Sequence, residues 1–217
     1  MSADVIKEPS DTDIGTVQNP RGNIQFVSII GQIEGHTILP PQNKSTKYEH
    51  VIPMLFQAAE KPDVDGMLVL LNTVGGDVEA GLAIAELIAH FGKPTVSLVL
   101  GGGHSIGVPL AVAANYSFIA ESASMTVHPV RMSGTVVGAP QTHLYFEKMQ
   151  ERVSDFIVNH SDISKERLKE LMMDTNTMAL DIGSVLVGFE AVSEGIINEV
   201  GGLYEAMEKL YAMVGKS

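Results

Sequence analysis

The feature that most constrains this chain is a repeated order of apolar run, glycine-rich turn and helix pattern. Residues 66–71 and 95–100 are mainly apolar runs, and each is followed first by glycines and then by a helix-like segment. Apolar strands without alternation are typical of parallel sheets covered by helices on both faces. The order therefore predicts an α/β fold.

Segments on both sides extend this pattern. Further strands are predicted at residues 24–30, 116–120 and 125–128, and helices at 48–60, 77–89, 105–115 and 142–160. Residues 129–140 and the loop-like stretch 174–188 fit no βαβ repeat, and we expect them beside an active site or a subunit interface. Residues 1–22 have few large apolar side chains and predict a flexible arm, which leaves residues 23–217 as a single domain.

Composition limits the classes of function. The 217 residues carry a net charge of −12, which argues against binding nucleic acid or anionic lipid. Without cysteine, the chain has no disulfide, no thiolate zinc site and no cysteine nucleophile. The N-terminus lacks signal-peptide order, and no window of about 18 apolar residues is present to span a bilayer. We therefore expect a cytoplasmic protein without a membrane span.

A serine lies inside the second glycine-rich turn. Residues 101–107 read GGGHSIG and place Ser105 directly after an apolar strand and before a helix-like segment. Small residues let a strand turn sharply into a helix, which exposes the serine hydroxyl and leaves backbone N–H groups free for an oxyanion. Glycine turns also occur for packing alone, so the turn makes Ser105 a candidate nucleophile.

The first turn has the same setting. Gly75 and Gly76 follow the strand ending at Leu71 and precede a helix that begins at Asp77. Turns at the carboxyl ends of neighbouring parallel strands face one crevice. Asp77 would repel phosphate, and the chain has no G-x-x-x-x-G-K-[ST] motif, so a nucleotide-binding turn is not predicted. The backbone N–H groups of Gly76 and Ile106 are instead candidate oxyanion donors.

A serine nucleophile needs a base, and seven histidines are candidates. His104 is adjacent to Ser105 and is expected to project away from it. His128 ends an apolar strand and precedes Pro129, which places it at the rim of the sheet, whereas the other histidines lie in predicted loops or on helix faces. We therefore predict His128 as the base.

Taken in this order, these segments resemble the ClpP family of serine peptidases. The family carries N-S-P-G-G, G-x-x-A-S-M-G and M-I-H-Q-P motifs, and this chain has NTVGG at 72–76, GGHSIG at 102–107 and TVHP at 126–129. EAVSEGIINEV at 190–200 is similar to the family's E-A-V-x-x-G-L-[VI]-D-x-[IV]. The resemblance covers roughly residues 24–205.

Within the family, the long N-terminus and IGSVLVG at 182–188 resemble the translocation-enhancing branch. The resemblance implies Ser105 as nucleophile, His128 as base, and the turn of Gly75 and Gly76, together with Ile106, as the oxyanion and substrate-binding element. It also implies a ClpP/crotonase-type spiral of ββα units with a protruding strand-helix handle at 129–160. No cofactor and no metal are expected.

The resemblance further implies homo-oligomers, as heptameric rings that stack through the handle, acting on peptides or unfolded proteins. The chain has no ATPase motif of its own, so unfolding a substrate would require a separate AAA+ unfoldase, and its N-terminal sequence does not support such a partner.

The third member of a Ser-His-Asp triad is less clearly marked. Asp174 keeps a family D-T dipeptide, whereas Asp181 is closer to the expected distance from Glu190, and we favour Asp181. The segment between Asp174 and Glu190 is longer than the family pattern. Either aspartate could instead be a turn or cap residue.

The predicted function is therefore serine endopeptidase, and three alternatives stay open. The chain could be a ring-forming scaffold that has lost catalysis, as the altered acid segment suggests. It could catalyse acyl-CoA chemistry of the crotonase type, which needs neither Ser105 nor His128. It could also use a Ser–Lys dyad, with Lys93 the nearest lysine in sequence.

Overall fold

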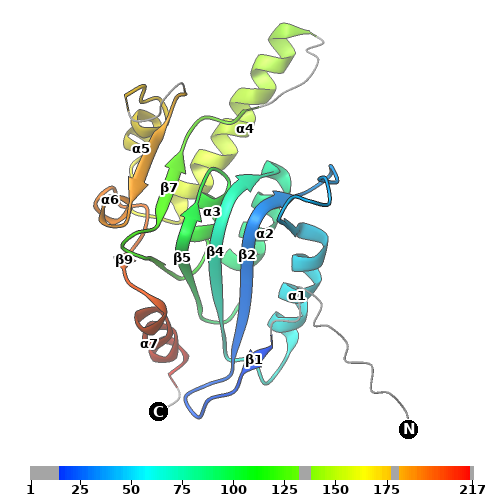
Figure 1. Cartoon of the computed structure of the whole chain (residues 1–217), viewed down its shortest axis with the longest axis vertical. Helices are drawn as coiled ribbons and strands as arrows, with labels where there is room; N and C mark the ends of the chain where they lie inside the picture. The colour runs from blue at the N-terminus through cyan, green and yellow to red at the C-terminus, as the bar shows by residue number, and fades with distance from the viewer. Residues whose placement is uncertain (1–14, 132–137, 177–180, 216–217) are drawn as a thin grey trace.

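The computed structural model describes residues 15–131, 138–176 and 181–215, in which a mainly parallel sheet is flanked by helices (Figure 1). The predicted α/β fold is confirmed. The strands are β1 (Thr16–Val17), β2 (Ile24–Glu34), β3 (Ser45–Lys47), β4 (Gly66–Gly76), β5 (Thr95–Gly103), β6 (Tyr116–Ile119), β7 (Ser124–Val127), β8 (Ser184–Val187) and β9 (Glu199–Val200). The helices are α1 (Tyr48–Glu60), α2 (Val78–Ala89), α3 (Gly107–Val112), α4 (Ala139–Asn159), α5 (Lys165–Met172), α6 (Phe189–Ser193) and α7 (Leu203–Val214).

The central path of the sheet runs β1-β2-β4-β5-β6-β9. Strands β2, β4, β5, β6 and β9 are parallel to one another. Strand β1 pairs antiparallel with β2, so the described part of the predicted N-terminal arm contributes a strand. Strands β7 and β8 form an antiparallel pair that joins β5 where Gly102 faces Ser124.

Alternate residues of the central strands pack into two cores on opposite faces of the sheet. In β4, Met67, Val69 and Leu71 belong to the core shared with α1, α2 and α3, whereas Leu68 packs with Leu210 of α7. All four of these β4 side chains are buried, as expected for a strand covered by helices on both faces.

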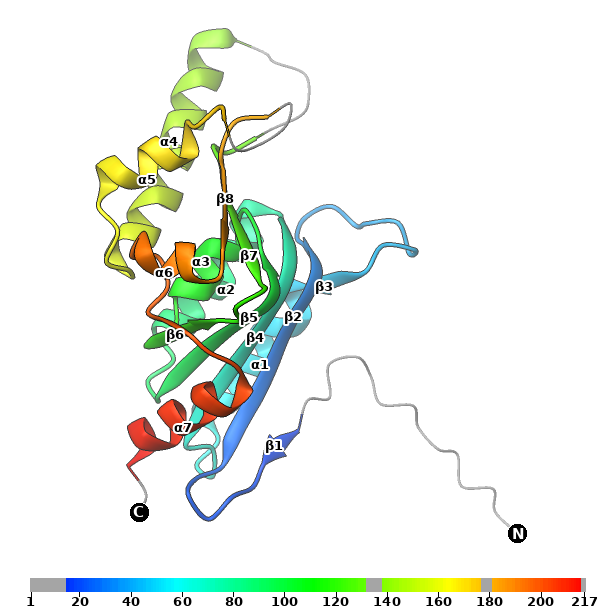
Figure 2. The same cartoon turned by 60° about the vertical axis from the view of Figure 1, so that its left-hand side comes forward.

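Local signals explain where two helices begin. Asp77 caps α2, because its carboxylate accepts a 2.9 Å hydrogen bond from the amide of Ala80. Helix α4 begins at Ala139, three residues before the predicted start, because Pro140 suits the first turn of a helix. Figures 1 and 2 show α4 extending beyond the edge of the sheet. Residues 132–137 of the predicted handle strand lie outside the described residues.

The structure corrects the predicted loop at residues 174–188, because this stretch contains β8. Val185 of β8 faces Thr126 of β7 in the antiparallel ladder. The pairing partner lies far away in the sequence, and local composition gives no indication of it. Within the described ranges, no helix is both long and apolar enough to cross a bilayer.

Candidate active site

The two glycine turns predicted to share a crevice lie against each other. They lie at the carboxyl ends of the neighbouring parallel strands β4 and β5, and Thr73 faces Gly103 at the end of their ladder. A Cβ atom added to Gly75 would lie 2.7 Å from the Cβ of Ser105 and 3.3 Å from its Oγ. Only a glycine at position 75 therefore leaves room for Ser105.

Ser105 has a left-handed backbone, with φ of 58°, and no other non-glycine residue in the described ranges has positive φ. This conformation costs about 1–2 kcal/mol for a side-chain-bearing residue. It is held by two hydrogen bonds: the Ser105 amide donates to the carbonyl of Thr126 at 2.9 Å, and the Ser105 carbonyl accepts from the amide of Val108 at 3.0 Å. A sharp, constrained turn that presents a serine between strand and helix is typical of nucleophilic serines.

The predicted oxyanion donors, Gly76 and Ile106, both line the pocket that contains Ser105. The amide of Ile106 precedes the first turn of α3, and no hydrogen bond occupies it within the described chain. The Gly75 amide instead donates to the Oγ1 of Thr73 at 3.0 Å. The Gly75 amide is therefore occupied, whereas the Ile106 amide is available to a ligand.

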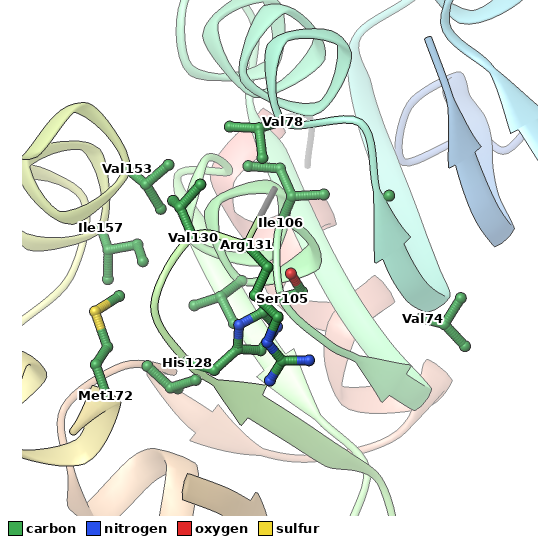
Figure 3. A pocket seen from close by; sticks show the side chains of 13 residues that line it. Val74, Val78, Ser105, Ile106, His128, Val130, Arg131, Val153, Ile157 and Met172 are labelled. Atoms are coloured by element: carbon green, nitrogen blue, oxygen red, sulfur yellow. The ribbon is translucent and has the colours of Figure 1, made fainter. Parts of the chain in front are cut away.

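His128 follows β7 directly and lines the same pocket as Ser105 (Figure 3). Its Nδ1 lies 2.7 Å from the carbonyl oxygen of Pro129. A carbonyl can only accept, so Nδ1 carries a proton, and in the neutral ring Nε2 is then the nitrogen that can accept a proton. No hydrogen bond joins His128 to Ser105 within the described residues.

Among the described residues, no hydrogen bond or ion pair joins Asp181 to His128. The carboxylate of Asp181 forms a 2.7 Å ion pair with Arg131 and also accepts from the amide of Ile182 at 2.8 Å. Asp174, the alternative, accepts from the amide of Asn176 at 3.0 Å, and its carbonyl binds the amide of Gly183.

A glycine lies opposite His128 on the neighbouring strand segment. A Cβ atom added to Gly183 would lie 2.8 Å from the Cβ of His128. Gly183 precedes β8, whose first residue faces Val127. Gly183 therefore offers no side chain that could contact the imidazole of His128.

The pocket next to Ser105 has a volume of about 260 Å³ and mostly apolar walls. Figure 3 shows Val153 and Ile157 of α4 and Met172 of α5 on one side, with Ser105, His128 and Arg131 at the centre. The sequence analysis did not assign these apolar residues to the site. The spacing of four between Val153 and Ile157 marks one face of a helix, but nothing in that spacing indicates which strand it packs against.

His104, the histidine adjacent to Ser105, is held away from it by another partner. Its Nδ1 lies 2.7 Å from the Oγ1 of Thr126, and its ring lies against the backbone of Gly102. Burial lowers the pKa of His104 below its ordinary value, which favours a neutral ring.

Lys93, the alternative base, is bound elsewhere. Its ammonium donates to the carbonyls of Ala58 and Lys61 at 3.1 and 2.7 Å, at the end of α1. Cations are favourable at helix C-termini, which accounts for this lysine structurally.

The site combines a parallel sheet, two opposed glycine turns, and a serine and a histidine in one pocket. Comparison with known proteins shows the family to which a chain with these features belongs. A family model described as Clp protease matches residues 21–203, and the chain belongs to this family. The resemblance that the motifs suggested is confirmed.

Two relatives extend the comparison. The chain is 59% identical to translocation-enhancing protein TepA of Halalkalibacterium halodurans over 196 residues, which covers 90% of this chain and 77% of that protein. It is 34% identical over 119 residues to capsid assembly protease C of Escherichia phage lambda, covering 54% of this chain and 27% of that protein.

Among solved structures, a point mutant of ClpP1 from Listeria monocytogenes has a similar fold, with a TM-score of 0.66 at 21% identity. The match covers 84% of this chain and 94% of the ClpP1 chain. At this level of identity the comparison shows a shared fold.

Proposed function

We propose that this chain is a serine peptidase with Ser105 as nucleophile and His128 as general base. The observation that carries the proposal is the placement of Ser105 on a constrained turn against Gly75, in one pocket with a histidine whose Nδ1 donates to the carbonyl of Pro129. In the proposed reaction, Ser105 Oγ attacks a peptide carbonyl while its proton passes to His128 Nε2.

The negative charge on the former carbonyl oxygen would be bound by the amides of Ile106 and Gly76. Return of the proton to the leaving amine breaks the peptide bond, and water then hydrolyses the acyl-serine by the same steps. The apolar pocket of about 260 Å³ supports a preference for substrates with an apolar side chain next to the cleaved bond.

Asp181 stays the proposed third member of the site. In the structure its carboxylate is held by Arg131, and Arg131 also lines the pocket. We therefore propose that Asp181 reaches His128 only when this exposed ion pair opens. Exposed pairs contribute only about 0–1 kcal/mol, so binding of a substrate or of a second subunit could supply enough energy to open it.

Self-assembly into rings, heptameric in the ClpP pattern, is part of the proposal. Large apolar side chains are exposed outside the pocket, including Val187, Phe189 at 72% and Tyr204 at 73%. Leu144 and Tyr145 are exposed on α4, the helix that projects from the sheet. These exposed apolar side chains support contacts with further copies of the chain, and native mass spectrometry would give the number of subunits.

The proposal is tested by incubating the chain with a disordered protein such as casein and identifying new peptide termini by mass spectrometry. Wild type is expected to generate new termini, and Ser105→Ala is expected to generate none while keeping the same subunit number. A wild type that assembles but cleaves nothing would favour the scaffold alternative, which the Arg131–Asp181 pair and the glycine opposite His128 also favour.

A further inference from the structure

The peptide group between Pro129 and Val130 is bound on both sides. Its carbonyl accepts from Nδ1 of His128 at 2.7 Å, and its N–H donates to Oε1 of Gln150 at 2.7 Å. In a trans peptide the C=O and the N–H point in opposite directions within one rigid plane. Gln150 therefore fixes the direction in which the carbonyl points, and so the direction from which His128 is held.

The side chain of Gln150 is itself fixed. Its Nε2 donates to the Oγ of Ser154 at 3.1 Å and to the Sδ of Met172 at 3.2 Å. Because sulfur and hydroxyl groups take the donor end of the amide, the oxygen of Gln150 is left to face Val130. The neighbouring Met149 and Val153 are buried, which anchors this part of α4 to the core.

Among the residues that the structure describes, the hydrogen-bond partner of His128 Nδ1 is the Pro129 carbonyl. Asp181 pairs with Arg131, and Gly183 on the opposite side has no side chain. Hydrogen bonds in a chain polarise one another, so the bond from Val130 N–H to Gln150 makes the Pro129 carbonyl a stronger acceptor. The peptide group thus occupies the place at Nδ1 that an aspartate occupies in a complete triad.

We propose that Gln150 is a positioning residue that keeps His128 in the Nδ1-protonated tautomer through the Pro129–Val130 peptide group. The effect of this tautomer on the reactivity of Ser105 rests on the proposed function, whereas the tautomer itself does not. While the pair between Asp181 and Arg131 is closed, Gln150 preserves an unprotonated Nε2 directed into the pocket. Gln150 acts from α4, a helix that the sequence analysis connected with assembly.

The test is histidine ¹⁵N NMR on the full chain, with the signals of His128 assigned by comparison with His128→Gln. Wild type and Gln150→Glu, which keeps an oxygen acceptor, are expected to show the Nδ1-protonated tautomer. Gln150→Leu is expected to show both tautomers in exchange. The control Gln141→Leu changes an exposed glutamine of the same helix and is expected to match wild type. Gln150→Met replaces Gln150→Leu if the latter does not fold.

A second measurement follows the rate of Ser105 modification by a fluorophosphonate. Gln150→Leu is expected to lower the maximal rate constant about tenfold, the factor that one hydrogen bond of ordinary strength represents. The half-saturating concentration should not change, because Gln150 does not line the pocket beside Ser105. Gln150→Glu should recover the rate to within about threefold.

The outcomes separate the inference from the proposed function. If wild type is not modified but the tautomer still depends on Gln150, the positioning role stands and the peptidase proposal fails. If wild type is modified but Gln150→Leu keeps both the single tautomer and the rate, the positioning role is overturned. Failure of Gln150→Glu to restore the tautomer would also overturn it.

Discussion

The two halves of the candidate site are held by different kinds of interaction. On the nucleophile side, the position of Ser105 is set by backbone hydrogen bonds and by contact with Gly75. On the acid side, the position of Asp181 is set by an ion pair with Arg131, whose side chain is 50% exposed. Backbone geometry set by a buried sheet is expensive to change, whereas an exposed ion pair opens at small cost. The turn that carries Ser105, the proposed nucleophile, is therefore built into the fold, whereas Asp181, the proposed acid, is held only by an exposed pair.

The strongest test of the rigid half is Gly75→Ala. The new Cβ would lie 2.7 Å from that of Ser105, and φ at this position is +89°. Displacing a nucleophile by about 1 Å can cost roughly 100-fold in rate, and we expect a loss of that size in fluorophosphonate labelling. Gly92→Ala is the matched control, because φ is +80° there and no atom lies within 4 Å of the new Cβ. Equal losses of labelling rate in both variants would show that the loss comes from backbone strain and not from contact with Ser105.

The proposed role of Asp181 is tested by Arg131→Gln, which removes the ion-pair partner of Asp181. If Asp181 then approaches His128, the labelling rate should rise by roughly tenfold, part of the ~10⁴-fold that an aspartate supplies in a complete triad. The gain should disappear in the double variant with Asp181→Asn. A double variant as fast as Arg131→Gln would remove Asp181 from the proposed site.

The stability of the turn should depend on pH through His104. Its folded pKa lies below the ordinary value of 6.5 because of burial, so the unfolded chain binds this proton more readily. The contribution of His104 to the free energy of unfolding is present above about pH 6.5. It falls as the pH drops below this value, by less than about 1.4 kcal/mol per pH unit. Melting temperatures of wild type and His104→Gln should converge as the pH falls from about 7.5 to about 5.5. A difference in melting temperature that stays constant across that range would show that His104 does not cause the pH dependence.

The smallest expected effect comes from an ion pair outside the site. Arg167 binds the carboxylate of Glu194 and lowers its pKa, so the contribution of this pair is present above about pH 4.5 and is lost as the pH falls below it. Both side chains are partly exposed, so Glu194→Gln should cost about 0.2–1 kcal/mol at pH 7, measured by urea unfolding. Labelling of Ser105 should not change. A loss above about 2 kcal/mol would show that the pair is not an ordinary surface pair.

The contrast between the halves also explains what could be predicted from sequence. The turns at Gly75 and Ser105 are local signals, since a strand, glycines and a helix are consecutive in the chain, and the structure brings the two turns together as expected. The extension of β2 to Glu34 was missed because Gly31 introduces a bulge where the apolar run ends.

The rest of the site depends on contacts between distant segments. The pairing of β8 with β7 and the packing of Met172 against the pocket have no local signature. The contact between Asp181 and Arg131 likewise joins segments separated by the whole of α4 and α5. The choice of Asp181 rested on its distance from Glu190, and sequence distance does not show which side chain a carboxylate will meet.

The most direct measurement of the central claim is intact-mass analysis of the chain after exposure to a fluorophosphonate. In this reaction Ser105 Oγ forms a bond to phosphorus, fluoride leaves, and His128 takes the hydroxyl proton. We predict a single adduct on wild type, none on Ser105→Ala, and labelling slowed at least about 100-fold in His128→Gln. An unmodified wild type, or an adduct that persists in Ser105→Ala, would contradict the assignment of Ser105 as an activated nucleophile.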